Sequence, residues 1–132
     1  DVAGMMLTQP NTLGLFEDQI EEAKQKSVHF LEIRAPKYLG YFERVIAGNS
    51  EGSDYAIGSA PTHVDLSIFQ LIAGLRYAFP KAMVRIEPDF PLASRLHDTV
   101  AALPRIAEYL ASDRRIPFNE KGVFRRYPEL DP

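Results

Sequence analysis

The chain has 132 residues, of which 45% are hydrophobic and 25% charged, and its formal net charge is −3. These values are ordinary for one folded domain, and they leave no broad basic surface of the kind that binds nucleic acid. The chain has no cysteine, which excludes disulfides, thiolate metal sites and cysteine nucleophiles. The sequence shows neither a membrane span nor a signal peptide, so we expect a cytoplasmic protein.

Glycines and prolines interrupt residues 1–15, which predicts an irregular lead segment. Apolar side chains then recur every three or four positions from Phe16 to Leu31, so we expect a helix over about 15–34. Pro36 predicts a boundary near Ala35 and the start of a second helix, which should end at about residue 48. Two arrangements fit this pattern: an antiparallel pair of helices, or one long bent rod.

Residues 48–61 have the composition of a loop, and the strongest helix prediction follows them. Thr62 can cap this helix, and Asp65 can accept a hydrogen bond from the backbone of Thr62, which together form a capping box. The positions after Asp65 are apolar on nearly every side, which predicts a central buried helix over about 63–79. We therefore assign Thr62 and Asp65 a structural, capping role.

The rest of the chain predicts three shorter helices and a tail. The helices are expected at about 81–86, over a stripe that includes Leu96 and Val100, and up to about residue 112, where Pro104 either starts a new helix or kinks the preceding one. An extended tail follows from residue 117 and should dock on the bundle through its apolar side chains Phe118, Val123, Phe124, Tyr127 and Leu130. No segment alternates as a strand does, so the predicted class is an all-α helical bundle, with the domain over 16–116 and the tail over 117–132.

The stretch from Tyr55 to Leu66 (YAIGSAPTHVDL) resembles the capping motif of glutathione transferases, with Val64 where that family usually has Ala. Residues 104–112 (PRIAEYLAS) look like the end of the same family's helical domain. Residues 117–131 look like the tail of its bacterial and fungal, sigma-like branch. The resemblance covers nearly the whole chain from Phe16, and it implies the C-terminal helical domain of a glutathione transferase.

In that family a thioredoxin-like N-terminal domain binds glutathione and supplies the catalytic residue. The resemblance therefore implies that this chain, which begins at Asp1, is a fragment that holds no catalytic residue and is inactive alone. The intact protein is expected to be a dimeric detoxification enzyme that conjugates glutathione, its co-substrate, to small hydrophobic electrophiles. We expect no tightly bound cofactor and no nucleic-acid or membrane partner.

The resemblance also implies roles for residues early in the first helix. Asp18, with Glu17 beside it, matches an acid that reaches the glutathione of the partner subunit; both could instead simply favour the helix dipole. Lys24, Gln25 and Val28 match positions that line the co-substrate pocket, or they form an ordinary helix face.

Two further expectations concern metal and the rival function. His29, His63 and His97 have no metal-ligand spacing, so we predict no metal site. The alternative function is a non-catalytic interaction module, because transferase-like helical domains also serve protein assembly. An activating Tyr, Ser or Cys in the upstream sequence would favour the enzyme. In either case, removal of the N-terminal domain should expose apolar surface and favour self-association.

Overall fold

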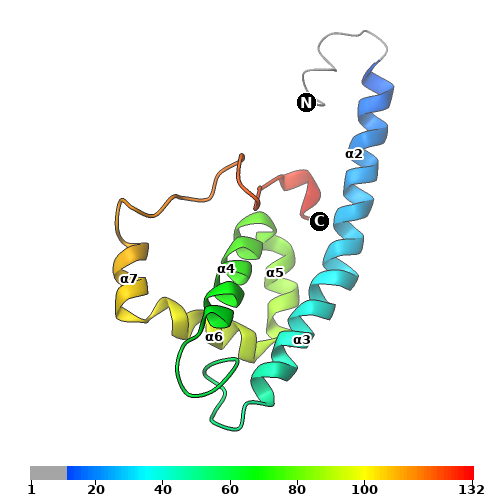
Figure 1. Cartoon of the computed structure of the whole chain (residues 1–132). Helices are drawn as coiled ribbons and strands as arrows, with labels where there is room; N and C mark the ends of the chain where they lie inside the picture. Colours follow the sequence, from blue (N-terminus) through cyan, green and yellow to red (C-terminus); the bar gives the residue numbers. More distant parts are fainter. Residues whose placement is uncertain (1–11) are drawn as a thin grey trace.

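A computed structural model of the chain describes the backbone from residue 12 to residue 132 and the side chains from residue 17. Within those residues the regular structure is helical throughout (Figure 1). Its α-helices are α2 (Thr12–His29), α3 (Ala35–Ala47), α4 (His63–Ala78), α5 (Pro80–Ile86), α6 (Pro91–Ala101) and α7 (Pro104–Leu110). The predicted all-α class is confirmed.

The first two predicted helices form one continuous rod, so the alternative of an antiparallel pair is wrong. The rod starts at Thr12, which makes residues 12–15 helical rather than irregular; the rest of the predicted lead segment, 1–11, lies outside the described residues. A π-helical turn, η1 (Phe30–Arg34), joins α2 to α3, and the N–H of Ala35 donates to the carbonyl of Phe30, five residues back.

The π-helical turn has two physical reasons. Proline lacks an N–H and its ring crowds the preceding helical turn, so the backbone widens immediately before Pro36. The buried residues Ser27, Leu31, Ala35 and Leu39 also recur at every fourth position. An α-helix of 3.6 residues per turn would rotate such a stripe by about 40° at each step. The wider turn offsets part of that rotation and keeps the stripe directed at the bundle.

The core of the bundle lies where α6 packs against α4 and α3. Ile46, Ile72, Leu96 and Val100 are at most 1% exposed, which confirms the predicted apolar stripes of the three helices. Helix α4 begins at the predicted residue and ends one residue early. It is not covered on every side, however, because Leu66 is 42% exposed.

Helices α5 and α6 share an unusual start: each begins at the proline of a Phe-Pro pair and has no capping side chain of its own. The first N–H groups of any helix need acceptors from outside the helix. Remote carboxylates supply them here. Asp131 accepts from the N–H groups of Lys81 and Ala82, at 2.8 and 2.9 Å. Glu43 of α3 accepts from Leu92 and Ala93, at 2.8 and 2.9 Å.

The tail runs back across the bundle and ends in a short 3-10 helix, η3 (Pro128–Leu130), beside α2 (Figure 1). The ring of Phe118 stacks on Tyr77 with the centroids 4.9 Å apart, and Phe124 meets Phe118 edge-on. The hydroxyl of Ser27 in α2 donates to the carbonyl of Leu130. The predicted anchor Val123 is wrong, since that side chain is 94% exposed. Tyr127, also predicted as an anchor, is exposed as well, and the buried side chain of the tail is Asp131.

Gly74 of α4 shows how closely the tail approaches the bundle. A Cβ atom at this position would overlap the ring of Phe124. The absence of a side chain at Gly74 therefore lets the aromatic ring of the tail rest on the backbone of α4. None of the helices in the described part of the chain is long and apolar enough to span a membrane.

Candidate functional site

The residues predicted to bind glutathione and its acceptor lie on α2. Glu17 and Asp18 are exposed, and no ion pair with another described residue engages either carboxylate. Lys24, Gln25 and Val28 lie one to three turns further along, where they line a shallow hollow of about 340 Å³. The structure thus brings the three proposed pocket residues together, and it leaves the two acids outside that hollow.

The N-terminal half of α2 stands away from the bundle (Figure 1). Outside the rod, α2 contacts the rest of the described chain mainly through η3 of the tail, and the bond from Ser27 to Leu130 lies in the C-terminal half of α2. Ile20 and Ala23, which belong to the predicted apolar stripe, are only partly buried, whereas Ser27 and Leu31 further along are buried. The apolar stripe of α2 therefore continues beyond the part of the helix that the bundle covers.

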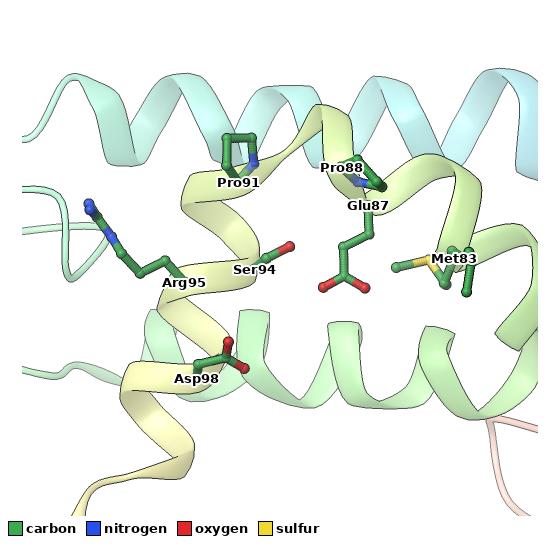
Figure 2. A pocket seen from close by; sticks show the side chains of 8 residues that line it. Met83, Glu87, Pro88, Pro91, Ser94, Arg95 and Asp98 are labelled. Carbon is green, nitrogen blue, oxygen red and sulfur yellow. The ribbon is translucent and has the colours of Figure 1, made fainter.

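A second hollow, of about 490 Å³, lies between α5 and α6 and was not predicted from the sequence. Figure 2 shows Glu87 reaching into it toward α4, with Ser94 facing Glu87 from α6 and Arg95 turned away. Its other lining residues include Met83, Pro91 and Asp98. Arg95 instead contacts the loop before α4, where it donates to the carbonyl of Ser53 at 2.9 Å.

Arg76 of α4 is the centre of the polar cluster behind this hollow. Its Nε lies 3.1 and 3.0 Å from the two carboxylate oxygens of Glu87, and its Nη1 lies 3.7 Å from Asp98. The hydrogen bond from Arg76 is the main cause that lowers the pKa of Glu87, and Glu87 in turn raises the pKa of Arg76. Glu87 is therefore ionised at neutral pH, and its carboxylate is hydrogen-bonded to Arg76. This state suits an ion pair and not a general acid or base.

His97 completes the cluster. Its ring stacks on Phe69 with the centroids 4.8 Å apart, and its Nδ1 lies 2.9 Å from both Arg76 Nη1 and Asp98 Oδ1. The nitrogen can accept from Arg76 when it is unprotonated or donate to Asp98 when it is protonated, but it cannot do both. Among the residues that the structure describes, no group of three His, Asp or Glu side chains could hold a metal ion.

We expect the Glu87→Gln variant to be less stable than the parent at neutral pH by about 1 kcal/mol, because the ion pair with Arg76 is half-buried. The pKa of Glu87 is lowered on folding from its ordinary value of 4.5. Its contribution to stability is therefore present above pH 4.5 and is lost as the pH falls through the lower, folded value. In thermal melts from pH 7 to pH 3, the difference in melting temperature between the parent and Glu87→Gln should shrink toward pH 3. Glu120→Gln, at an exposed tail position, is the control; a parent–variant difference that stays constant with pH would contradict the assignment.

The capping box before α4 has the predicted geometry. Thr62 Oγ1 accepts from the N–H of Val64 at 3.3 Å, and Asp65 Oδ2 accepts from the N–H of Thr62 at 2.7 Å. Asp65 is fully buried, and its other oxygen accepts from the N–H of Ala56 at 2.7 Å. One carboxylate therefore holds both the start of α4 and the loop that leads to it.

Comparison with known protein families assigns this chain to one of them. The family described as "Glutathione S-transferase, C-terminal domain" matches residues 8–113, which include the capping box and helices α2 to α7. The chain belongs to the glutathione S-transferase family. The resemblance carried by the capping motif is thus confirmed at the level of the family, and the sigma-like branch stays a prediction.

Curated members of the glutathione S-transferase family are similar to this chain over part of their length. A glutathione S-transferase of Plasmodium yoelii yoelii is 29% identical over 89 residues, which are 67% of this chain and 40% of that protein. Glutathione S-transferase P 1 of Bufo bufo is 28% identical over 66% of this chain and 40% of its own length. Glutathione S-transferase P 1 of Xenopus laevis is 25% identical over 78% and 52%. The chain spans about half the length of the curated relatives that it matches, or less.

Proposed function

We propose that this chain is the helical half of an enzyme that conjugates glutathione to small hydrophobic electrophiles. The observation that carries the proposal is the family match over residues 8–113, together with relatives named glutathione S-transferase of which the matched part is only 40% to 52%. A thioredoxin-like domain would bind glutathione and supply the catalytic residue in the intact protein. This chain would supply a wall for the electrophile and would be inactive alone.

The electrophile would lie against the hollow on α2 that Lys24, Gln25 and Val28 line. The partly buried Val28 offers apolar surface there, and the Lys24 ammonium, 4.0 Å from Glu21, lies at the edge. Asp18, with Glu17 beside it, would accept a charge-assisted hydrogen bond from the ammonium of the partner subunit's glutathione. The exposure of both carboxylates and their freedom from ion pairs with described residues support this role.

A homodimer in which α2 contributes to the interface is part of the proposal. Apolar side chains that the bundle does not cover support this interface. They are the partly exposed Ile20 and Ala23 in α2 and the exposed Ile33, Tyr38 and Tyr41 further along the rod. Apolar surface of this extent on one rod favours association. Light scattering should give at least twice the monomer mass of 14.9 kDa, and a monomer mass would contradict the dimer.

The test is steady-state kinetics of the full-length protein with glutathione and an aryl halide. We expect Asp18→Asn to raise KM for glutathione about tenfold, which is the loss of one charge-assisted bond, and to leave KM for the aryl halide unchanged. Val28→Ala should raise KM for the aryl halide and leave KM for glutathione unchanged. Glu22→Gln, at an exposed acid on the same helix, is the control. Equal KM values for Asp18→Asn and the parent would contradict the assigned site, and an inactive full-length parent would favour the non-catalytic interaction module.

A further inference from the structure

The tail between α7 and η3 has a charge opposite to that of the rest of the chain (Figure 1). Residues 113–126 contain five basic and two acidic side chains and have a net charge of +3, so the remaining residues have a net charge of −6. All five basic side chains are exposed, and none of them forms an ion pair with another described residue. They are Arg114, Arg115, Lys121, Arg125 and Arg126. The tail is therefore a positive surface on a negatively charged protein.

Two aliphatic side chains protrude from the same segment. Ile116 is 81% exposed and Val123 is 94% exposed. Phe118 and Phe124, which lie close to them in sequence, instead pack on α4. A single exposed aliphatic side chain is ordinary on a protein surface. Two of them among five basic groups, on a segment whose aromatic rings point inward, form a surface that combines positive charge with apolar tips.

Local hydrogen bonds and the two aromatic anchors hold this segment in one shape. Asn119 Nδ2 donates to the carbonyl of Pro117 at 3.2 Å, and Asn119 Oδ1 accepts from the N–H of Lys121 at 2.8 Å. Arg125 Nε donates to the carbonyl of Gly122 at 2.9 Å. The basic groups and the aliphatic tips are thus in place before a partner binds, so binding costs little ordering entropy.

We propose that the tail attaches this protein to the surface of a membrane that contains anionic lipids. The basic side chains would meet the anionic headgroups, and Ile116 and Val123 would enter the interfacial region beneath them. The protruding tips favour a lipid surface over an acidic protein, because a soft surface admits them anywhere, whereas a protein must offer a complementary pocket for each. The sequence-based expectation of no membrane partner was drawn from the lack of a membrane span, and surface attachment needs none.

The uneven charge would also orient the protein on the membrane. Screening limits charge interactions to about 8 Å at physiological ionic strength, so the tail is attracted while acids further away are repelled only weakly. Each basic group near an anionic surface strengthens binding about fivefold, so a net charge of +3 should contribute about a hundredfold. Attachment of this strength is reversible. The proposal uses neither the α2 hollow nor the transferase activity, and it is tested independently of both.

The test is sedimentation of the 132-residue chain with vesicles of two compositions. Vesicles of phosphatidylcholine with about one third phosphatidylserine should bind the chain about a hundredfold more tightly than vesicles of phosphatidylcholine alone. Added salt should weaken this binding. Equal binding to both kinds of vesicle, or no binding to the anionic ones, would overturn the proposal. Binding to soluble poly-L-glutamate but not to vesicles would indicate an acidic protein partner and would overturn it as well.

Two double variants with the same change in net charge locate the surface. Arg114→Gln with Arg126→Gln should weaken binding to the anionic vesicles about 25-fold. Arg34→Gln with Arg85→Gln removes the same charge from exposed positions in the rod and in α5, and it should have little effect. Circular dichroism checks that both proteins are folded. Equal weakening by the two double variants would show that only net charge matters, which would refute the tail as the attachment surface.

Insertion of the aliphatic tips has a direct readout, because the chain has no tryptophan. The fluorescence of Val123→Trp should shift to the blue when anionic vesicles are added, whereas that of Val84→Trp, at a position of α5 that is 76% exposed, should not. Ile116→Ser with Val123→Ser should weaken vesicle binding about tenfold, as expected when two aliphatic side chains are partly buried. If Val123→Trp binds the anionic vesicles without a blue shift, the tips do not enter the lipid and the proposal fails.

Discussion

The Asp65→Ala variant should lose about 3 kcal/mol of unfolding free energy, which combines the loss of a helix cap with that of buried hydrogen bonds to a charged group. The carboxylate accepts from the N–H of Ala56, the N–H of Thr62 and the hydroxyl of Thr62, at 2.7, 2.7 and 2.8 Å. Its removal leaves the buried Ala56 N–H without a partner and opens a cavity beneath the loop. For a domain of this size the melting temperature should fall by about 10 °C.

Two comparisons test the origin of that loss. Asp65→Asn keeps the volume but replaces one acceptor oxygen with an NH₂ donor, so it should recover only part of the stability. Asp89→Ala, at an exposed acid, should change the unfolding free energy by less than about 0.5 kcal/mol. A melting curve of Asp65→Ala that superimposes on that of the parent would remove the capping role.

The Asp131→Ala variant should lose about 2 kcal/mol, although Asp131 lies in the tail. The side chain is 3% exposed and accepts from the N–H groups of Lys81 and Ala82, while Lys81 Nζ donates to the Asp131 carbonyl at 3.1 Å. Without the carboxylate, the start of α5 has no acceptor, since Phe79 offers none. Amide hydrogen exchange should quicken first at Lys81 and Ala82.

The destabilisation caused by Asp131→Ala should also extend to α2, because Ser27 of α2 donates to the carbonyl of Leu130, the residue before Asp131. Glu129→Ala, an exposed neighbour, provides the matched control and should leave exchange at Lys81 and Ala82 unchanged. If those two amides keep their protection in Asp131→Ala, the carboxylate is not the group that caps α5.

Local patterns were enough to predict α4 and its capping box, because the participants lie within four residues of one another. The rod was ambiguous, since Pro36 can start a new helix after a turn or, as here, follow a π-helical turn inside a continuous one. The choice depends on what α2 packs against, and that contact lies far away in the sequence.

The caps of α5 and α6 were missed for the same reason. A Phe-Pro start without a polar residue does indicate that an acceptor must come from elsewhere, but nothing local selects Glu43 or Asp131 from the other acids. Val123 was expected to anchor the tail because it is apolar, yet it is exposed, and the buried anchor is an acid. The hollow beside Glu87 is likewise formed by side chains from separate helices.

The two remote caps also bear on kinetics. The bonds from Leu92 to Glu43 and from Lys81 to Asp131 join residues 49 and 50 positions apart. Closing loops of that length is entropically costly and slow compared with forming a helix, so both bonds should form after the rate-limiting step of folding. Their loss would then accelerate unfolding and leave the refolding rate nearly unchanged, which makes these carboxylates determinants of how long the native state persists.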